Sequence, residues 1–193
     1  MSPLLHWRQD LLKGCTFLTL MVSGCAPIAG GPPPIGMAPG VQQEFGTSTT
    51  AAATSESPFL EQNLWLRKAV GNHSELQLSG GIFTSGDLFY HVAVGYRFYF
   101  QPDSAPNRTG IDFKLGGLYY FEAGVPMSFE LTDRLWLTSH PSAGFNPFGL
   151  VKVPLGLSWN LNKGRRLHSS VGTRFMGENP TLFYGNVGLS FPF

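Results

Sequence analysis

One short stretch of the sequence carries residue types that can perform nucleophilic chemistry. His168 and Ser170 are two positions apart, so on a β-strand their side chains share one face, and Glu178 follows beyond them. A histidine beside a serine can remove the hydroxyl proton, and a carboxylate can orient the histidine. Arg166 and Arg174 fall on the same face, which favours the plainer interpretation of a histidine and a serine on a charged, structural surface.

The remaining residues that often perform chemistry are scattered. Beyond the N-terminal region the other histidines are His73, His91 and His140, and none has the spacing of a metal-ligand pair. The glycine pairs at 80–81 and 116–117 lie in segments with strand periodicity, where glycine favours bending more than phosphate binding. The sequence therefore predicts neither a metal site nor a cofactor.

Composition narrows the class of protein. Only 13% of the 193 residues are charged, while aromatic residues also reach 13%. That charged share is about half of what an ordinary soluble domain carries. A formal net charge of +1 gives no electrostatic reason for a nucleic-acid partner. No uncharged apolar run reaches the roughly 20 residues of a spanning helix, which argues against a helical membrane protein.

The N-terminus has the organisation of an export signal. Arg8 and Lys13 form a basic region, and residues 14–24 form an uncharged, mostly apolar run. Such a run is too short to cross a membrane and stop there, but it suits the apolar core of a secretory signal. We therefore expect the first part of the chain to be removed during export.

The apolar run ends in Val22-Ser23-Gly24-Cys25. These residues resemble the lipobox of bacterial lipoproteins, in which an aliphatic residue, a small residue and Gly or Ala precede the lipidated cysteine. The resemblance implies a signal peptide over 1–24, acylation of Cys25 with groups such as palmitate, and sorting to the outer membrane. The alternative is a cleaved signal followed by an unmodified cysteine. It is disfavoured because Cys15 leaves with the signal and a lone thiol is a liability in an oxidising compartment.

A low-complexity stretch follows the signal. Residues 26–40 are dominated by Pro, Gly and Ala, and residues 47–57 by Ser, Thr and Ala, so neither can form a hydrophobic core. We expect residues 25–58 to form a disordered tether between the lipid and a folded domain, with a weak strand over 41–52 as an open alternative. The folded domain is predicted to span 59–193.

Beyond about residue 60 the sequence alternates with a period of two. In 88–100 every even position is Leu, Val, Tyr or Phe, whereas the odd positions include His91, Gly95 and Arg97. Similar alternation occupies 62–70, 74–84, 109–121, 123–131, 134–142, 151–161, 166–176 and 183–193. Turn residues such as Gly, Asn, Asp and Pro separate these segments. The pattern predicts an all-β fold of antiparallel strands.

The direction of the apolar face separates two architectures. A soluble β-domain buries its apolar face and exposes charged residues. Here the opposite face is poor in charge and rich in Gly, Ser and Asn, as in the lumen of a transmembrane barrel whose apolar face meets lipid. We therefore predict a small antiparallel up-and-down transmembrane β-barrel, with a periplasmic soluble β-domain as the alternative.

The C-terminus supports the barrel and bears on the number of strands. The last segment is apolar at alternate positions and ends on Phe193, although Pro192 cannot donate a hydrogen bond to a sheet. It resembles the C-terminal strand of bacterial outer-membrane β-barrel proteins, which implies the barrel insertion machinery as a partner. Nine strands are readable, but two termini on one side of the membrane require an even number. We expect eight to ten strands and prefer ten, with the tenth over 41–52.

Charged residues of both signs fall on the predicted lumen face. Because an unpaired charge is costly in a narrow lumen, these residues should form a network that closes the channel. Its predicted members are Glu75, Arg97, Asp112, Lys114, Glu130, Lys152 and Arg174.

The function expected from these features is structural or interactive and not enzymatic. We expect an outer-membrane β-barrel lipoprotein, anchored through Cys25, with membrane lipid as its surroundings and no nucleic-acid partner. A barrel that transports or binds a small molecule is the first alternative. The second is a lipid A-modifying hydrolase, because His168, Ser170 and Glu178 resemble the His-x-Ser and later Glu of outer-membrane lipid A deacylases. The spacing to Glu178 departs from that family's pattern.

Overall fold

The computed structural model describes residues 31–38, 40–53, 58–85, 87–117, 120–145, 150–161, 164–176 and 179–193. The predicted signal peptide, Cys25 and Glu178 lie outside these ranges. The strands are β1 (Gln43–Ala53), β2 (Pro58–Ala69), β3 (Ser74–Ser85), β4 (Asp87–Tyr99), β5 (Arg108–Gly116), β6 (Tyr120–Gly124), β7 (Met127–Thr132), β8 (Leu135–Ser139), β9 (Ser142–Phe145), β10 (Leu150–Asn160), β11 (Arg166–Met176) and β12 (Asn179–Pro192). Among the described residues, no helix is long and apolar enough to cross a membrane.

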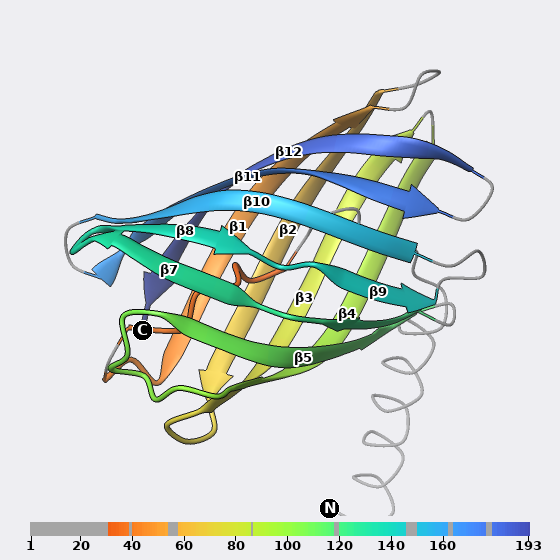
Figure 1. Ribbon diagram of the computed structural model, residues 1–193. Coiled ribbons are helices and arrows are strands. Elements are labelled where there is room, and N and C mark those ends of the chain that lie inside the picture. The colour runs from red at the N-terminus through yellow and green to blue at the C-terminus, as the bar shows by residue number, and fades with distance from the viewer. Residues whose placement is uncertain are drawn as a thin grey trace, which may run out of the picture.

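The strands close into a barrel (Figure 1). β5 pairs with both β6 and β7, so β6 and β7 together form one strand with a break in it. In the same way β10 pairs with both β8 and β9, and these two form another interrupted strand. The breaks fall at Val125-Pro126 and His140-Pro141, because proline cannot donate to the ladder. Counted in this way, the described residues form a closed antiparallel barrel of ten strands, as predicted.

β1 is the strand that closes the ring. It pairs with β2 along its whole length and with β12 from Glu44 to Ala53. Its Gly, Ser and Ala residues favour a strand little, although its threonines do, so the two neighbouring strands supply much of the stabilisation. The predicted strand over 41–52 is confirmed, and the eight-stranded alternative is wrong.

Deletion of residues 41–55 is expected to abolish heat-modifiable migration on gels. Without β1, the edges of β2 and β12 lose their partner and the barrel cannot close. The measurement compares boiled and unboiled samples of protein extracted from membranes. Deletion of residues 26–40 is the control, because it leaves every strand in place and should preserve the shift. Normal migration of the 41–55 deletion would contradict the role of β1.

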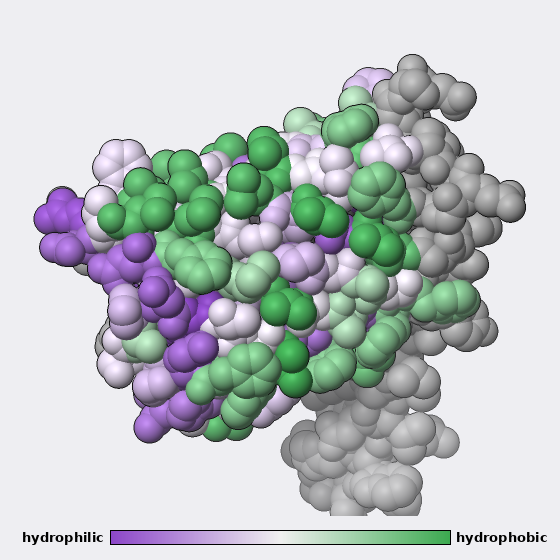
Figure 2. Space-filling model, viewed as in Figure 1, coloured by the Kyte–Doolittle hydropathy of each residue, from purple (hydrophilic) through white to green (hydrophobic). Residues whose placement is uncertain are grey.

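Side chains alternate between the lumen and the outer surface. On β4, Val94 and Tyr96 are exposed, whereas His91 and Arg97 are buried in the lumen. Figure 2 shows apolar side chains spread over the barrel wall, with hydrophilic ones gathered at the end where β7 and β8 are joined. The apolar face of the sequence pattern is therefore the outer surface.

The first and last strands meet at one end of the barrel, since Glu44 lies opposite Pro192. We call this end the C-terminal mouth. The strand order brings the turns at 70–73, 100–107 and 133–134 to the same end, together with the last residues of β10 and the first residues of β11. The even number of strands is the reason that the chain enters and leaves the barrel on one side.

Candidate functional site

A network of ion pairs fills the lumen near the C-terminal mouth. The Arg97 guanidinium lies 3.0 Å from Asp112 Oδ2 and 3.1 Å from Glu75 Oε1. Arg67 lies 2.9 Å from Glu44 Oε2 and 3.5 Å from Glu75 Oε1. All five side chains are buried, so Glu75 joins two arginines into one continuous network. Because each charge has a partner of opposite sign, the network can persist away from water.

A second cluster surrounds Glu122 deeper in the lumen. Lys152 Nζ lies 2.6 Å from Glu122 Oε2, and Lys114 Nζ lies 4.0 Å from Glu122 Oε1. The Tyr120 hydroxyl donates to the same carboxylate. Arg174 is buried beside Lys152 across the β10–β11 pair. Glu122 is therefore the shared counter-charge of two lysines.

The two clusters contain all but one of the residues predicted for the lumen network. The exception is Glu130, which is half-buried on β7 and has no ion pair with another described residue. A register shift between Glu130 and Thr132 interrupts the regular alternation at this point. The backbone amide of Glu130 donates instead to Asn107 Oδ1 at 2.9 Å, close to the C-terminal mouth.

Several buried charged residues of the lumen escaped the sequence analysis. For four of them the signal was present, because Glu44, Glu61, Arg67 and Glu122 each adjoin an exposed apolar residue of the opposite parity. The missed residues are Glu44, Glu61, Arg67, Arg108, Glu122 and Arg166. Glu44 was missed for a further reason, because it lies in the segment that was expected to be a tether.

The pairing of His168 with Ser170 that the hydrolase alternative requires is absent among the described contacts. His168 Nδ1 lies 2.8 Å from Ser158 Oγ, and Nε2 lies 3.0 Å from Ser190 Oγ. Both ring nitrogens are occupied, so neither is free to accept a proton from Ser170. Glu178 lies outside the described residues. The structure therefore gives the hydrolase interpretation no geometric support.

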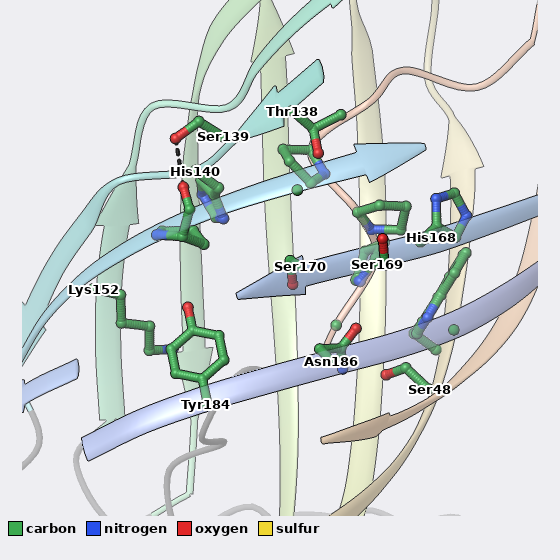
Figure 3. A pocket seen from close by; sticks show the side chains of 18 of the residues that line it. Ser48, Thr138, Ser139, His140, Lys152, His168, Ser169, Ser170, Tyr184 and Asn186 are labelled. Carbon is green, nitrogen blue, oxygen red and sulfur yellow. Dashed lines mark hydrogen bonds between the residues drawn. The ribbon is translucent and has the colours of Figure 1, made fainter. Parts of the chain in front are cut away.

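A cavity of about 70 Å³ lies inside the barrel between the Glu122 cluster and His168. Figure 3 shows Lys152 and Tyr184 at one side of it and His168 and Ser48 at the other. Its lining combines polar and apolar groups, and the buried Ser48 hydroxyl has no hydrogen-bond partner in the described part of the chain. A cavity of this size with several polar groups in its wall can hold a few water molecules.

Residues 31–38 of the expected tether lie in the lumen, and we call them the lumen segment. Its Ile35 and Met37 side chains are buried. Its carbonyl oxygens accept hydrogen bonds from the barrel wall, because a guanidinium has more donors than its carboxylate partners occupy. The bonds run from Arg97 Nη1 to Pro33 O (2.8 Å), Arg67 Nη1 to Ile35 O (2.5 Å), Arg166 Nη1 to Gly36 O (2.6 Å) and Tyr99 Oη to Pro34 O (3.5 Å).

The part of the lumen that the structure describes shows no metal centre. Among the described residues, no three His, Cys, Asp or Glu side chains are grouped so as to hold a metal ion. The ion pairs neutralise the buried charges of the lumen, and the side chains and the lumen segment fill most of its space. The candidate site is therefore the closed lumen itself.

Comparison with solved structures finds likenesses of low sequence identity. The N-terminal β-barrel domain of OprF from Pseudomonas aeruginosa is 11% identical, with 79% of this chain and 99% of that chain covered and a TM-score of 0.39. The translocator domain of the autotransporter NalP from Neisseria meningitidis is 11% identical (80% and 89% covered, TM-score 0.47). Neisserial surface protein A (NspA) is 10% identical (86% and 100% covered, TM-score 0.41). No family model and no curated protein matches the sequence.

Proposed function

We propose that this chain is a structural β-barrel protein of the bacterial outer membrane, anchored in addition by a lipid on Cys25. One observation carries the proposal: the distribution of polarity is inverted. Leu64, Leu155 and Val171 are 58%, 55% and 65% exposed, whereas Glu61, Arg67 and Arg97 are fully buried. In water so much exposed apolar surface is a liability, but in a bilayer it is the favoured arrangement.

The outer surface also has the banding of a bilayer. Aliphatic residues occupy the middle of the strands, as Leu155 on β10 and Val187 on β12 illustrate. Most of the exposed aromatic residues lie towards the two ends, and Phe113 in the middle of β5 is an exception. Those near the C-terminal mouth include Phe45, Phe98, Phe129 and Trp159, and those near the opposite end include Phe121, Phe145, Phe175 and Phe183. Two aromatic girdles around an aliphatic band suit the two interfaces of a membrane.

The filled lumen supports a structural role. Ion pairs span it, and the lumen segment occupies the space that they leave. The proposed lipid rests on the lipobox residues ending at Cys25, which precede the lumen segment by only a few positions.

Membrane fractionation of the full-length chain and of Cys25→Ala tests both parts of the proposal. We expect the wild type in the outer-membrane fraction, with radiolabelled palmitate incorporated and with heat-modifiable migration. Cys25→Ala should lose the label, because no other thiol follows the signal, yet keep the migration shift, because the barrel does not depend on the lipid.

Cys15→Ala is the matched control and should keep the label. Label retained by Cys25→Ala would refute the lipid anchor. Solubility of Cys25→Ala without detergent would refute the membrane barrel and support the soluble β-domain.

A further inference from the structure

We propose that the outer surface around β1 is an interface through which two copies of this barrel pair in the membrane. This inference rests on the proposed membrane-spanning function and adds a partner to it, a second copy of this chain. Three features carry it: hydrogen-bonding groups at mid-depth on β1 and β2, two projecting leucines on β2, and a groove over β11 and β12.

Thr49 on β1 and Gln62 on β2 place a hydroxyl and an amide on the outer surface, where hydrocarbon is expected. Thr49 Oγ1 lies 2.8 Å from Gln62 Nε2 and 3.0 Å from Gln62 Oε1, and both side chains are exposed. Thr49 is four positions from Phe45, near the C-terminal mouth, and four from Ala53, which pairs with Phe183 near the opposite end. The polar pair therefore lies midway between the two aromatic girdles.

The Gln62 amide has more hydrogen-bonding capacity than Thr49 can use. An amide has two N–H donors and two acceptor lone pairs, and one hydroxyl group at these two distances occupies at most two of the four. The cross-strand neighbour of Gln62 on β3 is Ile82, and the outward neighbours along β2 are Leu60 and Leu64. Lipid tails supply neither donors nor acceptors, so an occupant with polar groups at this depth is favoured over lipid.

A second copy of the chain supplies matching polar groups at the same depth. Two copies inserted in the same direction can be related by a two-fold axis along the membrane normal, because rotation about that axis changes neither depth nor direction. An axis beside Thr49 brings the Gln62 amide of each copy within reach of the polar pair of the other. The outward side chains of β1 after Phe45 are only threonine and alanine, so the two walls can approach closely.

The surfaces on the two sides of β1 have complementary shapes. On one side, β2 projects Leu60 and Leu64, which are 49% and 58% exposed. On the other side, a groove of about 470 Å³ lies over β11 and β12, lined by Val171, Gly185 and Val187, with leucines of β10 at its far edge. A two-fold axis at β1 exchanges the two sides, so the β2 leucines of each copy face the groove of the other.

Two substitutions disrupt this interface without disturbing the barrel that carries it. A Cβ atom at Gly185 would have only Ser170 O within 4 Å, at 4.0 Å, so Gly185→Leu should fill the groove from the outer surface. Gln62→Leu removes the amide and introduces a side chain that lipid accepts. Ala123→Leu is the matched control, because it adds a leucine to a groove of similar size on β6, five strands from β1 in either direction around the ring.

Single cysteines test the contact in intact outer membranes. Oxidation with copper phenanthroline should link Ala51→Cys into a disulfide dimer, because the axis brings the two copies of β1 together, whereas Ala123→Cys and the wild type should stay unlinked. A linked species of any mass other than twice that of the chain would overturn the second copy as the partner. Equal linkage through both cysteines, or none through Ala51→Cys, would overturn the β1 face as the interface.

Sedimentation in detergent micelles measures the dissociation constant of the dimer. We expect dimers for the wild type and Ala123→Leu, and monomers for Gly185→Leu. Gln62→Leu should raise the dissociation constant about 3- to 30-fold, as expected for the loss of a hydrogen bond within the membrane. A monomeric wild type, or dimers of Gly185→Leu and Gln62→Leu as tight as those of the wild type, would contradict the interface.

Heat-modifiable migration of each variant separates the possible failures. If one of the two interface variants does not migrate as a folded barrel, the other decides. A wild type that migrates as folded but sediments as a monomer overturns the interface alone. Absence of the migration shift in the wild type contradicts the proposed membrane barrel instead.

Discussion

Replacement of Arg97 by alanine is expected to lower the free energy of unfolding by about 3–5 kcal/mol, the cost of leaving a buried ion pair without one partner. Arg97 is fully buried between Glu75 and Asp112, at 3.1 Å and 3.0 Å. Alanine removes the shared cation and leaves both carboxylates short of a counter-charge in the lumen. It also removes the donor to the Pro33 carbonyl oxygen. Urea unfolding in liposomes, followed by heat-modifiable migration, measures the loss.

Two further substitutions serve as comparisons for the result of Arg97→Ala. Arg97→Lys keeps the charge but cannot bridge Glu75 and Asp112 with a planar fork, so its loss of stability should be intermediate. Lys68→Ala removes an exposed cation from the outer face and should change stability by no more than about 0.5 kcal/mol. A loss for Arg97→Ala as small as that for Lys68→Ala would show that the lumen network does not stabilise the barrel.

Replacement of Leu155 by arginine is expected to cost about 2–4 kcal/mol in a bilayer, the penalty for a basic residue on the lipid face at mid-depth. Leu155 lies in the middle of β10, is 55% exposed, and pairs across the outer face with Val171. Hydrocarbon surrounds an arginine at this position, and the side chain must reach for the interface. Urea titration in liposomes measures the change.

Val70→Arg is the matched control for membrane depth. Val70 is as exposed as Leu155, but it follows the end of β2 at the C-terminal mouth. At the interface the cost of arginine falls to about 0–1 kcal/mol. Equal, small effects at Leu155 and Val70 would indicate that both side chains meet water, and would favour the soluble β-domain.

Much of the fold was predictable from alternation alone. A period of two over residues such as Val94, Tyr96 and Arg97 specifies a strand and assigns each side chain to one of two faces. The scarcity of charge on both faces indicated that the apolar one points outward, as observed. Parity of the termini then required an even number of strands, eight or ten, and β1 supplies the tenth.

The membership of the lumen was predictable in part, but its partners were not. Parity placed Arg97, Asp112 and Lys152 in the lumen because it depends only on position along a strand. Partners depend on the register between strands, which brings Arg97 beside Glu75 on β3 and Asp112 on β5. The interruption of β7 after Glu130 is likewise a property of pairing, and it left that residue outside the network.

The sequence by itself determined the barrel, the outward apolar face and the charges that line the lumen, because these follow from local alternation. Only the tertiary structure determined the conformation of two segments whose local preferences are weak. β1 is a strand because β2 and β12 flank it, and residues 31–38 lie in the lumen because arginines from β2, β4 and β11 bind their carbonyl oxygens. Neither segment carries a strong local preference, so its conformation is set by donors and acceptors that are distant in the chain.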